Sequence, residues 1–247
     1  MRLGQAAMEA LRAEITGCLK PGDELVVACP VALKGTSVIA KSKKDKLAER
    51  FSAGFIQNCI FLWDSYGAQR EVESQTAANE QSDTHSDTQA GAQAGQSEKH
   101  SVVWKIAEEA GASALYAMGE GGFLSALWKM AEASEVGLEV DFRKVLIRQE
   151  TIEVCEIFDL NPYKLQAEGS VLIGIRGGEA LVQRLRNEGF MAEIIGQTNS
   201  GNDRLLYSGG SNANKLEDLI KKIGIEKHVL RDISYIELLT GSCPIDR

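Results

Sequence analysis

Residues 116 to 140, YAMGEGGFLSALWKMAEASEVGLEV, contain three glycines followed by an apolar stretch and a short β-forming run. Gly119, Gly121 and Gly122 predict a turn, because glycine adopts backbone conformations that other residues avoid. The residues that follow have the spacing of an amphipathic helix, and the run at the end predicts a strand. Such a turn either holds a phosphate or only joins two packed elements.

The flanking sequence continues this alternation of strands and helices. Strands are predicted from Glu24 to Cys29, at the two ends of residues 170–198, and at 204–207. Helices are predicted within residues 33–51, 101–111, 148–161, between the strands of 170–198, and over 216–223. This pattern predicts an α/β domain in which helices cover a sheet.

The helix predicted within 148–161 has a defined core face. Its sequence places Ile152, Cys155 and Phe158 at helical spacing, so these side chains are predicted to face inward. The residue before a proline disfavours helical geometry, and the helix is therefore predicted to end before Pro162.

Composition excludes several classes of protein. The chain has 247 residues, 44% of them hydrophobic and 25% charged, which is typical of a globular protein with a real core. Its net charge of -8 argues against nucleic acid as a partner. The basic run at 41–46, KSKKDK, is interpreted as a solvated helix face. No apolar run has the length of a membrane span and the N-terminus lacks a signal sequence, so a cytoplasmic protein with no membrane partner is expected.

Cysteines and histidines do not predict a metal site. The sequence contains no Cys-x-x-Cys pair, which favours reduced core thiols over disulfides or zinc ligands. The residues concerned are Cys18, Cys29, Cys59, Cys155 and Cys243, together with His85, His100 and His228.

Residues 67–100 differ in composition from the rest of the chain. This tract has no aromatic residue, and Val72 is its only branched aliphatic side chain. It cannot bury enough apolar surface to offset its ordering entropy. A disordered low-complexity insertion is therefore predicted, with residues 1–66 and 101–247 forming one domain around it.

Several segments resemble the C-terminal domain of the AIR synthase related superfamily. They are KPGDELVVACPVALKGTSVIA from Lys20, AEASEVGLEVD, RQETIEVCEIFDLNPYKL and AEIIGQTNSGNDRLLY, and the resemblance covers Lys20 to Tyr207 apart from the insertion. It is most similar to the hydrogenase-maturation, HypE-like branch and its uncharacterised bacterial relatives. The resemblance implies an α/β (α+β) fold with a mixed, mainly antiparallel sheet of about four strands covered by helices.

The chain departs from the family pattern in two places. The family has an ATP-binding domain, with acidic residues that hold magnesium, ahead of the segment matching Lys20. Residues 1–19 are too few for it, so the N-terminal ATP-binding domain is predicted to be absent. The family's glycine turn commonly reads His-Asp-x-Thr-x-Gly-Gly, whereas Tyr116, Ala117 and Gly119 occupy the three polar positions here.

Two groups of residues remain candidates for a phosphate or ligand cleft. Gly119, Glu120, Gly121 and Gly122 could offer backbone N–H groups to an anion at a helix start, although the Glu120 carboxylate would oppose it. The resemblance places Gly35 and Thr36 at a helix start that faces the family's interdomain cleft. For each group a structural role is the favoured interpretation: a tight packing turn for the first, and a helix cap by Thr36 for the second.

These departures predict a stand-alone, catalytically degenerate member that acts as a binding or partner module. No catalytic residue and no metal site are assigned, and no cofactor is expected for the chain alone; ATP and magnesium would require a partner that supplies the missing half. A small phosphorylated ligand is the other candidate partner, and oligomeric state is not predicted. The alternative is one half of an enzyme for ATP-dependent phosphoryl or carbamoyl transfer or dehydration, with its nucleotide-binding domain on a separate chain.

Cys243 invites comparison with the HypE-like branch. In that branch the cysteine at the C-terminus carries the carbamoyl group. Here Pro-Ile-Asp-Arg follows Cys243, so an unreactive tail thiol is the favoured interpretation.

Overall fold

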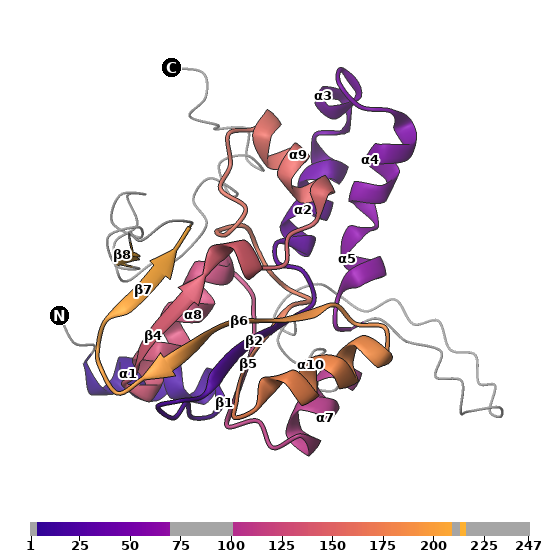
Figure 1. Cartoon of the computed structure of the whole chain (residues 1–247). Helices are drawn as coiled ribbons and strands as arrows, with labels where there is room; N and C mark the ends of the chain where they lie inside the picture. Colours follow the sequence, from indigo (N-terminus) through magenta and orange to yellow (C-terminus); the bar gives the residue numbers. More distant parts are fainter. Residues whose placement is uncertain (1–3, 70–100, 209–212, 216–247) are drawn as a thin grey trace.

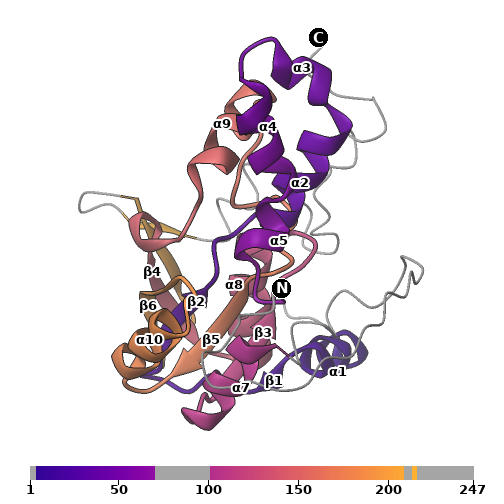
Figure 2. The same cartoon turned by 90° about the vertical axis from the view of Figure 1, so that its right-hand side faces the viewer.

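The computed structural model describes residues 4–69, 101–208 and 213–215. One sheet runs through the lower part of the molecule as drawn, with helices on both faces, and a separate group of helices extends beyond one end of it (Figures 1 and 2). This arrangement confirms the α/β class.

The sheet is larger than expected. Its order within the described residues is β1-β3-β5-β2-β6-β4-β7-β8. The strands are β1 (Thr16–Gly17), β2 (Glu24–Ala28), β3 (Ala114–Ala117), β4 (Gly137–Asp141), β5 (Val171–Ile175), β6 (Ala192–Asn199), β7 (Arg204–Tyr207) and β8 (Ala213–Lys215). All neighbours are antiparallel except β4 and β7, which are parallel. The mixed, mainly antiparallel character is as expected, but the number of about four strands was wrong.

Short strands account for much of the difference. β1 and β8 contain two and three residues, which is too few to show the two-residue alternation that identifies a strand in sequence. β3 has four residues and lies directly before the glycine turn, whose signal dominates that part of the sequence.

The helices form three groups around the sheet. They are α1 (Gln5–Glu14), α2 (Leu33–Ser42), α3 (Lys44–Ala48), α4 (Ala53–Ile60), α5 (Leu62–Tyr66), α7 (Val102–Glu109), α8 (Gly122–Ser134), α9 (Gln149–Ile157), α10 (Gly178–Asn187) and the 3-10 turn η1 (Phe142–Lys144). α8 and α1 lie on one face of the sheet, α7 and α10 on the other, and α2, α3, α4, α5 and α9 form the group at one end (Figure 2).

Central strand β2 is buried on both faces. Leu25 and Val27 belong to the core cluster that contains α8, whereas Val26 and Ala28 belong to the cluster that contains α7 and α10. Successive side chains in a strand point to opposite faces, so a strand covered on both sides must be apolar at every position. This explains the uninterrupted run LVVA in an antiparallel sheet.

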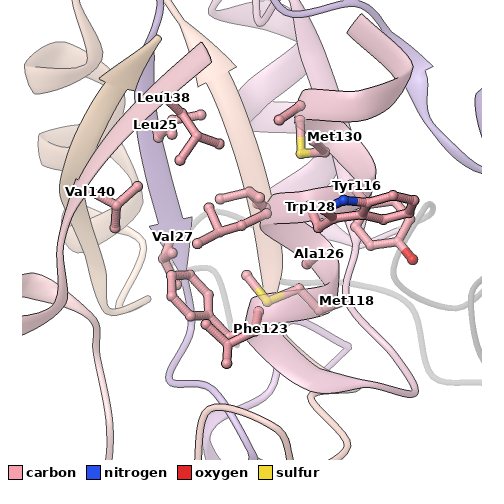
Figure 3. Close-up of a cluster of buried hydrophobic side chains, with 14 of the residues drawn as sticks. Leu25, Val27, Tyr116, Met118, Phe123, Ala126, Trp128, Met130, Leu138 and Val140 are labelled. Atoms are coloured by element: carbon pink, nitrogen blue, oxygen red, sulfur yellow. The ribbon is translucent and has the colours of Figure 1, made fainter. Parts of the chain in front are cut away.

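Helix α8 is mostly buried, and the charged residues on the polar side of the predicted amphipathic helix, Lys129 and Glu132, are half-buried. None of its thirteen residues is exposed. Phe123 and Met130 belong to the same core cluster as the sheet residues Leu25, Val27 and Leu138, and Phe123 lies by Val27 (Figure 3). On another side α8 packs against α1, which buries Leu11 in the same cluster.

Helix α9 ends before Pro162 as predicted, but its core face is rotated. The buried residues are Thr151, Val154, Cys155 and Phe158, which follow the i, i+3, i+4, i+7 pattern. Ile152 lies outside this stripe and is 37% exposed, so its predicted inward orientation was wrong.

A buried carboxylate joins four parts of the sheet. Asp23, in the turn before β2, is 1% exposed and accepts hydrogen bonds from the Lys20 amide (2.7 Å) and the Ser113 hydroxyl. The Asp23 backbone amide donates to the Thr198 hydroxyl oxygen at 3.0 Å, and Arg176 Nε lies 3.8 Å from its carboxylate. The turn is thereby tied to β3, to β5 and to β6.

Most of the predicted insertion lies outside the described residues. Of residues 67–100, the structure describes Gly67 to Gln69, where Ala68 is buried and its amide donates to the Gly169 carbonyl at 2.8 Å. The helix predicted over 216–223, the three histidines and Cys243 also lie outside the described part.

Three of the four cysteines that the structure describes are buried, namely Cys29, Cys59 and Cys155, whereas Cys18 is exposed. Burial, with a contribution from Glu150, raises the pKa of Cys59 to about 12, so this thiol is neutral near pH 7. Within residues 4–69, 101–208 and 213–215, no three His, Cys, Asp or Glu side chains are grouped for a metal ion, and no helix is long and apolar enough to cross a membrane.

Candidate functional site

The glycine turn connects the end of β3 to the start of α8. Gly121 has φ of 82° and Gly122 has φ of 68°, both in the left-handed region that favours glycine. Gly121 is also the residue that caps α8, and it has no side chain to accept a hydrogen bond from the helix start. Backbone geometry alone therefore favours glycine at these two positions.

Gly122 also lies against another part of the chain. A Cβ atom at this position would be 2.6 Å from the Leu165 carbonyl oxygen and 2.7 Å from the Tyr163 carbonyl oxygen. Both neighbours are backbone atoms, which cannot swing aside as a side chain can. The absence of a side chain at Gly122 allows the segment 163–167 to pass directly over the helix start.

Hydrogen bonds tie the same segment to the turn. The Leu124 amide donates to the Tyr163 carbonyl at 3.1 Å, and the Ala167 amide donates to the Gly119 carbonyl at 3.1 Å. The Gly122 amide donates to the Gly119 carbonyl at 3.2 Å. One of the N–H groups that the sequence offered to an anion is thus already used within the turn, and the third residue of the helix is bonded to segment 163–167.

The second candidate group lies at the start of α2. The Gly35 amide donates to the Gln166 carbonyl at 3.0 Å, and a Cβ atom on Gly35 would be 3.0 Å from Leu165 Cβ. Thr36 is fully buried; its hydroxyl donates to the Ala32 carbonyl at 2.8 Å. Thr36 does not cap the helix as predicted, because α2 begins earlier, after Ala32.

Segment 163–167 therefore joins the two candidate groups, which are far apart in sequence. It contacts Gly35 through Leu165 and Gln166, and Gly122 through Tyr163 to Leu165. Of the six candidate residues, only Glu120 is exposed; Gly119 is half-buried and the others are buried. The structure brings the predicted groups together by packing them on one strap of chain, which we call the 163–167 strap.

Sequence reasoning missed the cation beside Gly35. Lys34 Nζ lies 3.4 Å from the centre of the Trp63 ring, a cation–π contact between α2 and α5. One turn further along α5, Arg148 stacks on Tyr66 at 4.2 Å while pairing with Glu150. In both contacts the cation and the ring are far apart in sequence. The sequence offered one indication of these contacts, namely two aromatic residues, Trp63 and Tyr66, three positions apart on one helix.

Residues 63–207 match the C-terminal domain of the AIR synthase related protein family. The chain belongs to this family. The carbamoyl dehydratase HypE of Rhodobacter capsulatus is 30% identical over 102 residues, which cover 40% of this chain and 30% of that protein. The resemblance inferred from the sequence is thus confirmed, including its HypE-like character.

Solved structures of the hydrogenase maturation protein HypE share the fold. One is similar with a TM-score of 0.52 and 16% identity, covering 80% of this chain and 53% of HypE. Another is HypE in a HypE–HypF complex, with a TM-score of 0.50 and 19% identity, covering 79% of this chain and 52% of that one. The chain spans about half the length of these solved relatives.

Glu120 offers a direct test of the two interpretations of the turn. If the turn is structural, Glu120→Gln should lower the free energy of unfolding by about 0.3 to 1 kcal/mol, because a carboxylate near the N-terminus of α8 is favourable. Phosphate should not raise the melting temperature of either protein. Thermal melts with and without phosphate measure both effects. A melting temperature that rises with phosphate, and rises further in Glu120→Gln, would restore the phosphate-site interpretation.

Proposed function

We propose that this chain is a catalytically degenerate member of the AIR synthase related family that serves as a binding or partner module in metabolism or metalloenzyme maturation. The observation that carries the proposal is the turn at residues 116–122. The polar positions of the family pattern are occupied here by Tyr116, Ala117 and Gly119. Ala117 and Gly119 have no group that could orient a metal or donate to a phosphate.

Tyr116 does not replace the missing chemistry. Its side chain is 6% exposed, and its hydroxyl accepts a hydrogen bond from Lys129 Nζ at 3.0 Å. Lys129 in turn donates to Glu14 of α1 at 2.7 Å. Burial raises the pKa of the Tyr116 hydroxyl, so it remains neutral, and the group serves to fasten α1 to α8.

Packing supports the same proposal. The 163–167 strap is bonded to the start of α8 and to the start of α2, where a ligand would need free backbone amides. A partner role is supported by the similar fold of HypE, which is known in a complex with HypF. We propose no bound cofactor for the chain alone, with ATP and magnesium available only through a partner that supplies a nucleotide-binding domain.

Titration with magnesium-ATP tests this proposal. We expect the purified chain to bind magnesium-ATP more weakly than about 1 mM, equivalent to about -4 kcal/mol, and to release no phosphate from it. Isothermal titration calorimetry measures the affinity, and HypE, whose structure is known in complex with ATP, provides the positive control. Micromolar binding would contradict the proposal and favour the alternative, an enzyme half for phosphoryl or carbamoyl chemistry.

A further inference from the structure

The helical group carries a positively charged end. We define the basic tip by seven residues at the end of α2, on α3, at the start of α4 and in the connections between them: Lys41, Lys43, Lys44, Lys46, Arg50, Phe51 and Phe55. In both views, α3 and α4 lie at the end of the helical group that is remote from α7 and α10 (Figures 1 and 2). The basic tip therefore projects away from the sheet, where another macromolecule can reach it.

The charge of this region is opposite to that of the chain as a whole. Residues 41–50 contain five basic and two acidic side chains, a net charge of +3 in a protein of net charge -8. Lys46 forms an ion pair with Glu49 at 2.7 Å. In the part of the chain that the structure describes, Lys41, Lys44 and Arg50 have no ion-pair partner, and all three are exposed.

Two aromatic rings lie directly beside these charges. Phe51 and Phe55 are in contact, with their ring centres 4.4 Å apart and their planes tilted by 32°, and both remain half-buried. One side of the pair rests on the helical core, which includes Ile56 and Val154. A solvated helix face would account for the lysines alone, but it does not account for a contacting pair of aromatic rings left half-buried in the same part of the helical group.

We infer that the basic tip docks an acidic segment of a partner protein, with an apolar side chain of that segment on Phe51 and Phe55. Aromatic residues and arginine are enriched at protein interfaces, and complementary charges across an interface select the partner and raise the association rate. Nucleic acid fits less well, because the chain is acidic overall. The inference deepens the proposed partner-module role and rests on it.

A charge-reversal experiment tests the inference. The probe is a fluorescein-labelled acidic peptide of sixteen residues, in which leucines recur every three or four positions among glutamates. The full chain is titrated into the peptide, and binding is followed by fluorescence anisotropy. We expect saturable binding at about 50 mM salt that weakens severalfold at about 300 mM. Lys44→Glu with Arg50→Glu should weaken binding at least tenfold. The control, Lys105→Glu with Lys144→Glu, makes the same charge change at exposed residues elsewhere and should change binding less than twofold.

A second pair of variants tests the aromatic contribution. Phe55→Ala should weaken peptide binding about fivefold, whereas Phe61→Ala, which removes a 48% exposed ring from the opposite end of α4, should not. Circular dichroism melts show whether each variant is folded at the assay temperature. If Phe55→Ala is unfolded, the double variant Lys44→Glu with Arg50→Glu alone tests the inference. Absent peptide binding, equal losses in the controls, or binding of anionic phospholipid vesicles in place of the peptide would overturn the inference. The ATP titration is unaffected by these outcomes, so the proposed function can stand or fall separately.

Discussion

Replacement of Gly122 by alanine is expected to lower the free energy of unfolding by about 3 kcal/mol. A left-handed backbone costs a residue with a Cβ atom about 1 kcal/mol, and forcing that atom into a packed site costs about 1 to 3 kcal/mol more. At Gly122 both penalties apply, since φ is 68° and the new atom would lie 2.6 Å from the Leu165 carbonyl oxygen. Equilibrium urea unfolding measures the change.

Gly119→Ala is the matched control for this prediction. Gly119 belongs to the same turn, but a Cβ atom there would meet nothing within 4 Å, and its φ is not positive. We expect a change within about 0.5 kcal/mol. Similar costs for the two variants would show that the 163–167 strap does not press on the start of α8.

Replacement of Asp23 by alanine is expected to cost about 3 kcal/mol. The carboxylate is buried and accepts hydrogen bonds from the Lys20 amide and the Ser113 hydroxyl; its removal leaves the Lys20 amide without its acceptor and opens a buried gap, while the Ser113 hydroxyl keeps the Gly174 carbonyl at 2.9 Å. Unsatisfied buried groups cost about 1 to 3 kcal/mol each. The exposed guanidinium of Arg176, at 3.8 Å, adds little to this figure.

Two further variants set the scale for Asp23. Asp23→Asn keeps an oxygen that can accept one of the hydrogen bonds, and it should cost about half as much. Asp64→Ala removes an exposed carboxylate from α5 and should stay within about 0.5 kcal/mol. Chemical denaturation of the three variants in one buffer tests the order. Equal stability of Asp23→Ala and Asp64→Ala would show that the buried carboxylate is dispensable.

Elements with a continuous apolar run or a clear helical spacing of apolar residues were predictable from the sequence. The apolar runs of β2 and β5 and the helix after Gly178 lie where they were expected. The family match was also predictable, because the relevant segments are long and specific. The number of strands was not predictable. β1 and β8 have only two and three residues, and they form strands because neighbouring strands pair with them.

The environment of a helix was harder to predict than its existence. α8 contains Lys129 and Glu132, which suggested a face in water, but each is paired with a distant residue. Lys129 bonds to Glu14 at 2.7 Å and Glu132 to Arg204 at 2.6 Å. Both side chains are thus held by ion pairs to other elements and are only 23% and 17% exposed, which only the tertiary structure shows.

The candidate site was predictable as a list of residues but not as an arrangement. Glycines at two helix starts suggested phosphate contacts, because glycine permits the close approach of a ligand. In the structure it permits the close approach of the 163–167 strap instead. A sequence cannot distinguish these two uses of glycine, since both require only that a side chain be missing.

The central position of β2 also bears on how the chain folds. Ala28 pairs with Val171 on one side and with Ala192 on the other, so the middle of the sheet cannot form until most of the polypeptide has been synthesised and looped back. Such distant pairings predict slow folding compared with a helical protein of similar size. In the unfolded chain, residues 70–100 lengthen the loop between Ala28 and Val171 at a cost of only about 0.2 kcal/mol, because closure entropy grows with the logarithm of length. Lengthening the chain between these two strands therefore adds little to the entropy cost of forming the sheet.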